Sequence, residues 1–247
     1  MTGVAKGTVL SLLARIGKAC DEYQYDALRN LTTKRIQCDE IWSFCYAKAK
    51  NVPEDKKYTF GYGDVWTYTA IDADTKLILT WHIGRRDAAN ATVFMKDLAS
   101  RLANRVQLTT DGHKMYLSAV EDAFGGEIDF SQIVKLYGNT PESEVRYSPA
   151  ECTGIEIHTI EGNPEREHVS TSYVERQNLT MRMSMRRFTR LTNGFSKKVE
   201  NHACALSLYF MYYNFCRVHQ TLRVTPAMEA GVTDHVWKID EILCLID

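Results

Sequence analysis

Residues 36–44 are Ile36-Gln37-Cys38-Asp39-Glu40-Ile41-Trp42-Ser43-Phe44, an apolar strand pattern that contains two adjacent carboxylates. Side chains of a strand point alternately to its two faces, so Asp39 faces away from Cys38 and Glu40. A carboxylate that is buried without a partner costs several kcal/mol or becomes neutral. We therefore expect Asp39 to meet a metal ion, a cation or a hydrogen-bond donor.

Other strand and helix patterns surround this segment. Besides a first strand at 34–46, apolar runs predict strands at 64–71, 76–83, 106–110 and 132–137, with a short strand at 154–160. Helical periodicity predicts helices within 1–30 and at 90–104, 116–124, 173–190 and 197–218. The first three strands form a meander, and the later strands alternate with helices. This order predicts an α/β fold with a mixed sheet and helices on its faces.

Two further carboxylates lie at the end of a predicted strand and in a predicted helix. Asp111 ends the fourth strand and is followed directly by Gly112 and His113, whereas Glu175 lies one turn into the helix that begins near 173. Ligand sites in open α/β sheets gather at the carboxyl ends of strands. If the first and fourth strands are neighbours, Asp39 and Asp111 share a metal ion and Glu175 completes the site. Mg²⁺ prefers such oxygen ligands, and a pair of ions serves phosphoryl transfer. His113 either approaches this site or is a hydrogen-bonded loop histidine.

The charge of the chain is unevenly distributed. The net charge of −1 argues against nucleic-acid binding, but residues 176–198 hold seven basic residues and no acidic one, whereas 121–167 is acidic. Positions i+3, i+7 and i+11 from Glu175 share one helix face, which suits a DNA strand approaching the carboxylates. The candidate DNA contacts are Arg176, Asn178, Arg182, Arg186, Arg187, Lys197 and Lys198.

The composition is that of an ordinary globular protein of one or two domains, with 45% hydrophobic and 25% charged residues among 247. The N-terminus has no signal-peptide pattern, and the most apolar run, 203–215, is too short to span a bilayer. The seven cysteines, an odd number, indicate reduced thiols, and the lack of a Cys-x-x-Cys pair argues against a structural zinc site. We expect a cytoplasmic protein with no membrane partner. The lysine-rich segment 47–58 is expected to be an exposed loop.

Several segments resemble one family. Those around the carboxylates, 38–44 (CDEIWSF), 109–113 (TTDGH) and 173–178 (YVERQN), are similar to the three acidic motifs of bacterial insertion-sequence transposases of the DDE class. Segments 186–198, 212–222 and 225–228 extend this likeness over nearly the whole chain. The likeness is closest to the transposase group of the first-numbered insertion sequence element.

The resemblance implies a ribonuclease H-like catalytic core that uses two divalent ions, Mg²⁺ or Mn²⁺, for DNA strand cleavage and strand transfer. It places Asp39, Asp111 and Glu175 at the catalytic metal-ligand positions and Arg182 at a DNA-contacting position. The implied partner is double-stranded DNA, both the terminal inverted repeats of the element and the target DNA. Because two element ends must be brought together, a homodimer or larger assembly on DNA is expected, at the nucleoid.

Three regions are expected along the chain. Residues 1–33 are helical, either as a remnant of a helix-turn-helix or as an amphipathic helix packed on the main domain. Residues 34–195 form the catalytic core, in which the long separation of Asp111 from Glu175 predicts an insertion at about 138–172. Residues 196–247 form a C-terminal helical region packed on the core. The zinc element and complete helix-turn-helix common in the family do not occur in this sequence, so a shortened N-terminus is expected.

Two other functions fit the same residues. A metal-dependent nuclease on this core would hydrolyse DNA without joining it. A truncated, inactive copy would bind DNA as an inhibitor. The intact set of three carboxylates favours an active enzyme, because a relic is expected to lose at least one motif.

Overall fold

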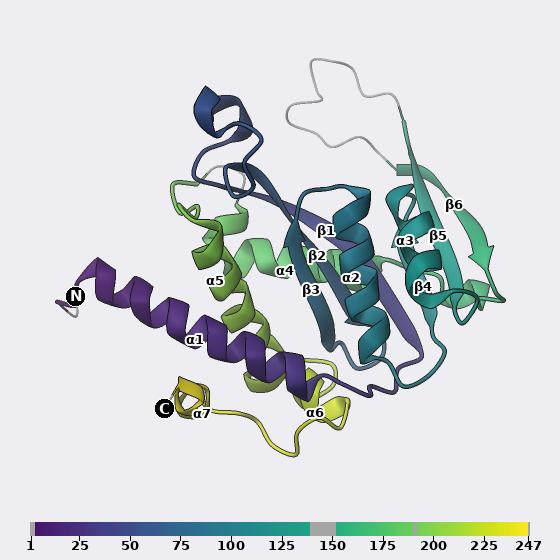
Figure 1. Ribbon diagram of the computed structural model, residues 1–247. Helices are drawn as coiled ribbons and strands as arrows, with labels where there is room; N and C mark the ends of the chain where they lie inside the picture. Colours follow the sequence, from purple (N-terminus) through teal and green to yellow (C-terminus); the bar gives the residue numbers. More distant parts are fainter. Residues whose placement is uncertain (1–2, 139–151, 190–191, 247) are drawn as a thin grey trace.

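The structure, a computed structural model, describes residues 3–138, 152–189 and 192–246. Six strands form one sheet in the order β3-β2-β1-β4-β5-β6 (Figure 1). The strands are β1 (Arg35–Cys45), β2 (Gly63–Asp72), β3 (Ile78–Gly84), β4 (Gln107–Asp111), β5 (Asp129–Tyr137) and β6 (Cys152–Glu161). The helices are α1 (Lys6–Ala27), α2 (Ala88–Arg101), α3 (Met115–Phe124), α4 (Ser172–Ser184), α5 (Val199–Met211), α6 (Pro226–Glu229) and α7 (Ile239–Leu243). None of the helices in these residues is both long and apolar enough to cross a membrane.

The strand directions define the fold. β1, β2 and β3 are antiparallel neighbours, and β4 and β5 run parallel to β1 on its other side. β6 pairs with β5 in the antiparallel direction. A three-stranded meander extended by two parallel strands beyond β1 is the sheet order of the ribonuclease H-like fold. The predicted α/β class and mixed sheet are therefore confirmed.

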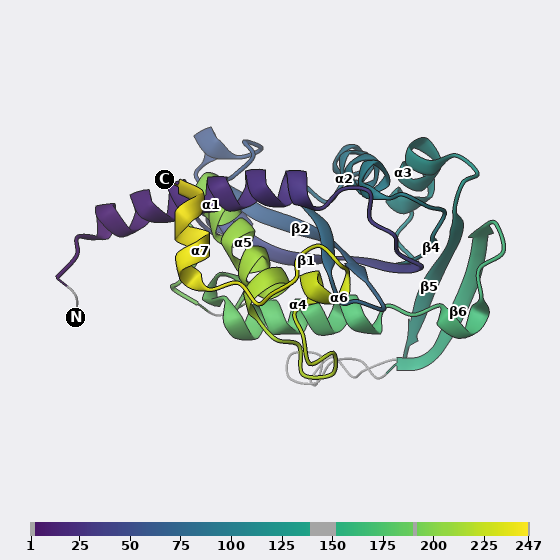
Figure 2. The same ribbon diagram turned by 90° about the horizontal axis from the view of Figure 1, so that it is seen from below.

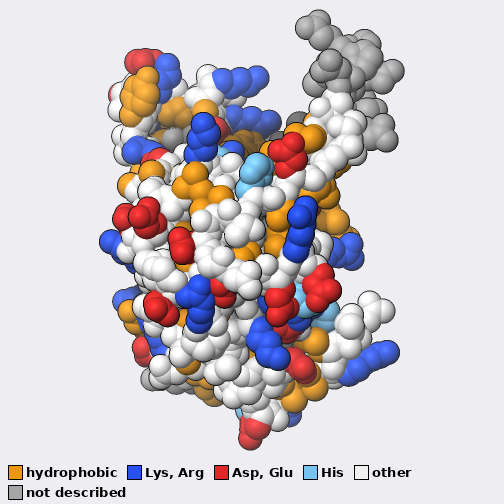
Figure 3. Space-filling view, turned by 90° about the vertical axis from the view of Figure 1, so that its right-hand side faces the viewer, with side chains coloured by type: hydrophobic (Ala, Val, Ile, Leu, Met, Phe, Trp, Pro, Cys, Tyr) orange, Lys and Arg blue, Asp and Glu red, His pale blue; other side chains and the backbone are white. Residues whose placement is uncertain are grey.

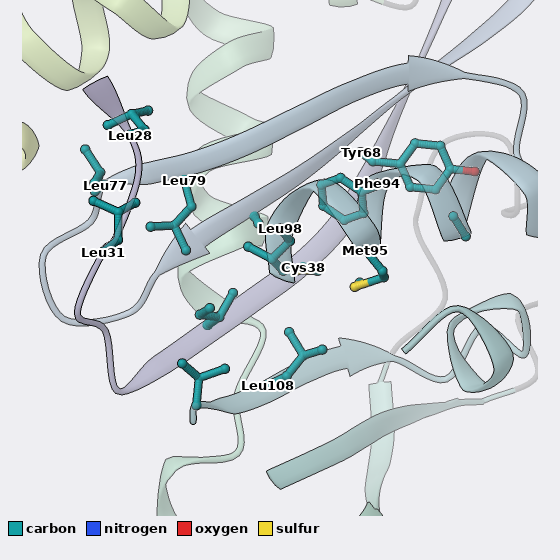
Figure 4. Close-up of a cluster of buried hydrophobic side chains, with 14 of the residues drawn as sticks. Leu28, Leu31, Cys38, Tyr68, Leu77, Leu79, Phe94, Met95, Leu98 and Leu108 are labelled. Carbon is teal, nitrogen blue, oxygen red and sulfur yellow. The ribbon is translucent and has the colours of Figure 1, made fainter. Parts of the chain in front are cut away.

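The sheet lies between two helical layers. α2 and α3 cover one face and α4 covers the other, as the view from below shows (Figure 2). On the α2 side, Cys38 of β1 joins a core that includes Tyr68 and Phe94 (Figure 4). On the α4 side, Ile41 of β1 packs in a second core with Val174. The alternation of β1 side chains thus fills both cores, and it directs Asp39 toward α4.

The second half of α1 packs against α5. Gly17 lies so close to Cys204 that an added Cβ would be 2.4 Å from the Cβ of that cysteine. Gln24 Nε2 donates a hydrogen bond to the carbonyl oxygen of Ser207 at 3.0 Å. The first turns of α1 project from the body of the molecule (Figure 1), where Leu12 is exposed. The second half of α1 is therefore a helix packed on the main domain. DNA binding by the first half of α1 stays a prediction.

The helix predicted at 173–190 is shorter in the structure. α4 ends at Ser184, the next residue is extended, and a 3₁₀ turn at Arg186–Phe188 follows. Phe188 is buried in this turn and lies against His202, with 5.3 Å between ring centroids. Burial of this ring turns the chain away from the helix axis, which helical periodicity alone does not predict. Arg186 therefore does not lie on α4, contrary to expectation.

The region expected to be an insertion, 138–172, contains a longer strand than predicted. β6 spans Cys152–Glu161, where a strand at 154–160 was expected, and residues 139–151 lie outside the described residues. β6 is an edge strand with mostly exposed side chains, among them Ile155. Figure 3 shows this side of the molecule, where acidic, basic and hydrophobic side chains are interspersed. Among the described residues on this side, the acidic bias of the sequence therefore does not produce a uniformly negative face.

Candidate metal centre

Asp39 and Asp111 lie together where the pairing of β1 with β4 ends. The parallel register stops at Cys38 of β1, opposite Thr110 of β4. Asp111 is the last residue of β4, so beyond Cys38 no described strand covers this edge of β1. Ligand oxygens of Asp39, Glu40 and Asp111 all lie within 4.8 Å of one another. The first and fourth strands are thus neighbours, and they bring the two aspartates to one place.

Asp39 is held by two donors and crowded by negative charge. Its Oδ1 accepts a hydrogen bond from the Glu40 amide at 2.8 Å, and its Oδ2 accepts one from Asn178 Nδ2 at 2.9 Å. Burial raises the pKa of Asp39 to about 6, and the charges of Asp111 and Glu175 add to the rise, while the two hydrogen bonds oppose it. A carboxylate in this state is stabilised strongly by a bound cation.

Asp111 is fixed by the tight turn that follows it. Its Oδ1 accepts a hydrogen bond from the His113 amide at 3.1 Å. A Cβ added to Gly112 would be 2.6 Å from Cγ2 of Val134, closer than side chains approach. The glycine between Asp111 and His113 therefore has a steric cause. Arg86 Nη2 lies 3.6 Å from Asp111 Oδ2 and supplies a positive charge to the site.

The start of α4 is set by β1. Gln37 lies two residues before Asp39 and shares its face of the strand. Its Oε1 accepts hydrogen bonds from the amides of Tyr173, at 2.8 Å, and Val174, at 3.2 Å. The side-chain amide of Gln37 therefore caps the first turn of α4. About one turn further along the helix, Asn178 donates a hydrogen bond to Asp39 on the same strand face. These two attachments fix the position of Glu175 relative to the sheet.

Glu175 lines the same cavity as Asp39 and Asp111, a hollow of about 530 Å³. Its Oε1 accepts a hydrogen bond from Thr171 Oγ1 at 2.6 Å and pairs with Lys135 of β5. Burial lowers the pKa of Lys135, but the hydrogen bond and charge of Glu175 outweigh this effect and raise it above its ordinary value. A charged lysine therefore neutralises the third carboxylate, which is not part of the 4.8 Å group.

Sequence reasoning did not assign Glu40, Arg86 or Lys135 to the site. Glu40 has a fully shielded side chain, and its Oε2 pairs with Arg86 Nη2 at 3.1 Å. Burial raises the pKa of Glu40 to about 7, and Asp111 and Asp39 contribute to the rise while Arg86 opposes it. The signal for Glu40 was its place beside Asp39 in an apolar strand. Arg86 and Lys135 carry no local pattern that separates them from solvated basic residues.

His113 lines the cavity and is half-buried. Its Nδ1 accepts a hydrogen bond from the amide of Met115, at the start of α3, at 3.3 Å. Burial, followed by the charge of Arg86, lowers its pKa, so the ring is neutral near pH 7. This geometry describes the hydrogen-bonded loop histidine, and an approach to a metal ion or phosphate stays a prediction.

The candidate DNA contacts divide into three groups by exposure. Asn178 is buried and bonded to Asp39, so it belongs to the carboxylate site. Arg187 is half-buried and donates to Ser196 Oγ at 2.5 Å, which ties the turn after α4 to the segment before α5. Arg182 is half-buried on α4. The exposed members of the group are Arg176, Arg186, Lys197 and Lys198.

The residues of the cavity fit a hard divalent cation. Its acidic side chains, Asp39, Asp111 and Glu175, offer oxygen atoms only, and none of the described residues that line it is a cysteine. Carboxylate oxygens select Mg²⁺ or Mn²⁺ over softer metals. Burial, together with the charges of Asp111 and Glu175, raises the pKa of Asp39, and a bound cation would oppose this rise. Arg86 and Lys135 supply positive charge to Asp111 and Glu175.

No protein-family model matches the sequence, and no curated protein matches it significantly. A similar chain occurs in the cryo-EM structure of a simian T-cell lymphotropic virus intasome in complex with PP2A regulatory subunit B56 gamma. That chain has 13% identity and a TM-score of 0.45, with 81% of this chain and 55% of that chain covered.

Two further similar chains come from transposase complexes. The piggyBac transposase synaptic complex with hairpin DNA gives 10% identity, a TM-score of 0.35 and coverage of 87% and 52%. The Mos1 strand transfer complex gives 11% identity, a TM-score of 0.28 and coverage of 82% and 61%. The chain thus spans between 52% and 61% of the length of these three chains. The fold assignment depends on the strand order, because such low TM-scores carry no weight.

Proposed function

We propose that this protein is a metal-dependent DNA transposase of the DDE class, which cleaves strands at the ends of an insertion sequence and joins them to target DNA. One observation carries the proposal: Asp39 and Asp111 meet where the pairing of β1 with β4 ends, in a cavity that Glu175 also lines. Two strand carboxylates and one helix carboxylate on a ribonuclease H-like sheet are the arrangement that the motif resemblance implies.

Asp39, Asp111 and Glu175 would hold the divalent ions, Mg²⁺ or Mn²⁺. Such ions, when bound, activate the attacking water or hydroxyl group and stabilise the leaving oxygen of the phosphate. Lys135 and Thr171 contact Oε1 of Glu175, so this carboxylate would hold an ion through Oε2, or through both oxygens once Lys135 has moved away. The ammonium group, once released, lies beside the cavity, where it can neutralise a phosphate oxygen.

The protein supplies position and charge around this centre. Asn178 keeps one oxygen of Asp39 in a fixed orientation, and Gln37 anchors the helix that carries Glu175. Arg176 and Arg186 are exposed beyond the site and are suited to phosphate contacts. Such contacts give affinity that depends on salt and little on sequence.

The test is nicking of supercoiled plasmid by the purified protein in Mg²⁺. Asp39→Asn, Asp111→Asn and Glu175→Gln each remove one metal-ligand charge with little change in volume, so each should abolish nicking while circular dichroism shows a folded protein. Glu127→Gln is the matched control, because Glu127 is an exposed carboxylate on the connection before β5. Full activity in any of the three site variants removes that residue from the proposed centre.

The same assay separates the transposase from the two alternatives. An inhibitor without catalytic activity nicks nothing in Mg²⁺ or Mn²⁺. A hydrolytic nuclease nicks plasmid but does not join pre-cleaved ends, taken from the DNA that flanks the gene, to a target plasmid. Strand transfer to the target is the outcome that the proposal requires.

The wider organisation also belongs to the proposal. Residues 34–195 form the catalytic core, 1–33 and 196–247 are the helical regions on either side of it, and the functional unit is a homodimer or larger on DNA. The substrates are the terminal inverted repeats and target DNA. Light scattering of the protein with and without a duplex of the repeat sequence tests the assembly.

A further inference from the structure

The connection between β1 and β2 contacts the segment before α5. Residues 46–62 form this connection, and with residues 192–198 they make a surface that we call the tip. The amide of Tyr46 donates to the carbonyl oxygen of Ser196 at 2.8 Å, and Cys45 and Ser196 form a parallel bridge. Gly61 lies close to Val199, so that an added Cβ would be 2.9 Å from its Cγ1. Two segments far apart in sequence are therefore built into one surface.

The tip is strongly basic. It holds six lysines and two acidic residues, a net charge of +4 in a chain whose net charge is −1. One acidic residue, Glu54, is paired with Lys57, so the free charge is mostly positive. The lysines are Lys48, Lys50, Lys56, Lys57, Lys197 and Lys198.

Aromatic rings alternate with these lysines. Tyr46 and Tyr62 form an edge-to-face pair with 4.9 Å between centroids, and Lys56 Nζ lies 4.7 Å from the Tyr46 centroid. Phe195 carries Lys197 Nζ over its ring at 3.9 Å. Tyr58 is 91% exposed.

Two hollows open between these rings. One, of about 440 Å³, is lined by Phe44, Tyr46, Lys48 and Phe195, among others. A second, of about 400 Å³, is lined by Phe60 and the chain around Lys197. Each hollow therefore combines an aromatic wall with a lysine.

We propose that the tip binds an unpaired DNA strand, with lysines on its phosphates and aromatic rings against its bases; the inference rests on the proposed function. Aromatic side chains set among positive charges are the recognition chemistry of single-stranded DNA, since every base offers a face for stacking. A protein interface explains the tip less well, because interface cores are depleted in lysine.

The position of the tip sets where on the DNA it acts. β1 continues from Asp39 to Cys45 and then enters the tip. Six strand residues span about 20 Å at about 3.3 Å each. At about 3.4 Å per nucleotide, this distance corresponds to about six nucleotides from the phosphate at the carboxylates. The tip therefore holds DNA that is melted or unstacked about half a helical turn from the cleaved bond.

The test uses a fluorescein-labelled thymidine 30-mer and fluorescence anisotropy in EDTA, with the full chain. Lys50→Ala, Lys197→Ala and Lys198→Ala combined remove three exposed charges, and we expect the slope of log affinity against log salt to flatten by about 2. Tyr58→Ala with Phe60→Ala should weaken binding about fivefold to a hundredfold with an unchanged salt slope. Lys96→Ala on α2 and Tyr25→Ala on α1 are the controls, because both residues are exposed and lie outside the tip.

Photocrosslinking gives an independent readout. A thymidine 30-mer with 5-iodouridine should attach to peptides from 46–62 or 192–198, as identified by mass spectrometry. Attachment only elsewhere, or unchanged binding in both tip variants, overturns the proposal. A change in oligomeric state without a change in DNA binding assigns the tip to a second copy of the chain and also overturns it.

Failure of the tip and failure of the proposed function are distinguishable. Binding in EDTA does not require the metal centre, whereas nicking does. Asp111→Asn should keep the affinity for the thymidine 30-mer and lose nicking. If the wild-type protein binds the oligonucleotide through the tip but never nicks DNA, the transposase proposal is overturned and the tip proposal is kept. If the wild-type protein nicks DNA and the tip variants bind the oligonucleotide as tightly as the wild type, only the tip proposal is overturned.

Discussion

Asn178 of α4 donates a hydrogen bond to Asp39 of β1 at 2.9 Å, and this bond joins a helix to a strand at the point where the carboxylates gather. The helix carries Glu175 less than one turn earlier. The orientation of Asp39 and the position of Glu175 are therefore coupled through one amide side chain. A residue expected to contact DNA thus also orients a carboxylate of the acidic site, and its contact with DNA stays a prediction.

Asn178→Leu should reduce nicking about tenfold to a hundredfold, as outer-shell partners of metal ligands do. The isosteric change removes the donor to Asp39 but keeps the helix, so the Mg²⁺ concentration at half-maximal activity should rise as well. Leu179→Ala is the control, because Leu179 is the exposed neighbour on the same helix. Equal Mg²⁺ dependence in wild type and Asn178→Leu contradicts the coupling.

Mg²⁺ binding should weaken as the pH falls below about 6. Burial raises the pKa of Asp39 from 3.8 to about 6, so its carboxyl group is protonated in the folded protein under conditions where the unfolded chain is ionised. A proton must then leave before Mg²⁺ binds, and the apparent affinity should fall about tenfold per pH unit below that pKa. Isothermal titration calorimetry between pH 5 and pH 8 measures this; a flat profile contradicts it.

The same shift predicts the stability of the metal-free protein. Between the unfolded and folded pKa values of Asp39, the folded state binds more protons than the unfolded state. The contribution of Asp39 to the free energy of unfolding therefore decreases as the pH rises from about 4 to about 6, and Mg²⁺ restores it above that range. Urea unfolding in EDTA gives the sign directly, with Asp39→Asn as the variant in which this contribution vanishes.

Lys135→Met should make the protein more dependent on Mg²⁺ for stability. The substitution keeps the length of the side chain but leaves Glu175 without its cation. The melting temperature in EDTA should fall, and the increase on adding Mg²⁺ should exceed that of the wild type, because the ion then replaces a missing charge. Lys96→Met should behave as the wild type, since Lys96 is exposed on α2. Equal Mg²⁺ effects in all three proteins would show that Lys135 does not neutralise the site.

Gly17→Ala should destabilise the protein by about 1–3 kcal/mol, because the new methyl group overlaps the backbone and Cβ of Cys204. Gly7→Ala on the same helix is the matched control. It meets nothing within 4 Å and should stabilise by at most about 1 kcal/mol through helix propensity. Chemical denaturation of both variants compares them. Similar effects of the two substitutions would mean that α1 does not pack on α5 in solution.

The fold was largely accessible from the sequence, because strand alternation and helical periodicity are local signals. Local sequence also identified Asp39, as a carboxylate in an apolar strand, and Asp111, as a carboxylate directly before Gly112. The partners of these residues did not, since Arg86 and Lys135 reach the site only through tertiary packing. The early end of α4 was missed for a similar reason: burial of Phe188 overrides a continuous helical pattern.

The pairing of β1 with β4 stops at Cys38, one residue short of Asp39. Asp111 faces the cavity only in the present register, because a shift of one residue would turn every side chain of β4 to the opposite face of the sheet. The meeting of the two aspartates thus depends on the exact length of one five-residue strand. Insertions into β4 should consequently silence the protein even when every acidic group is kept.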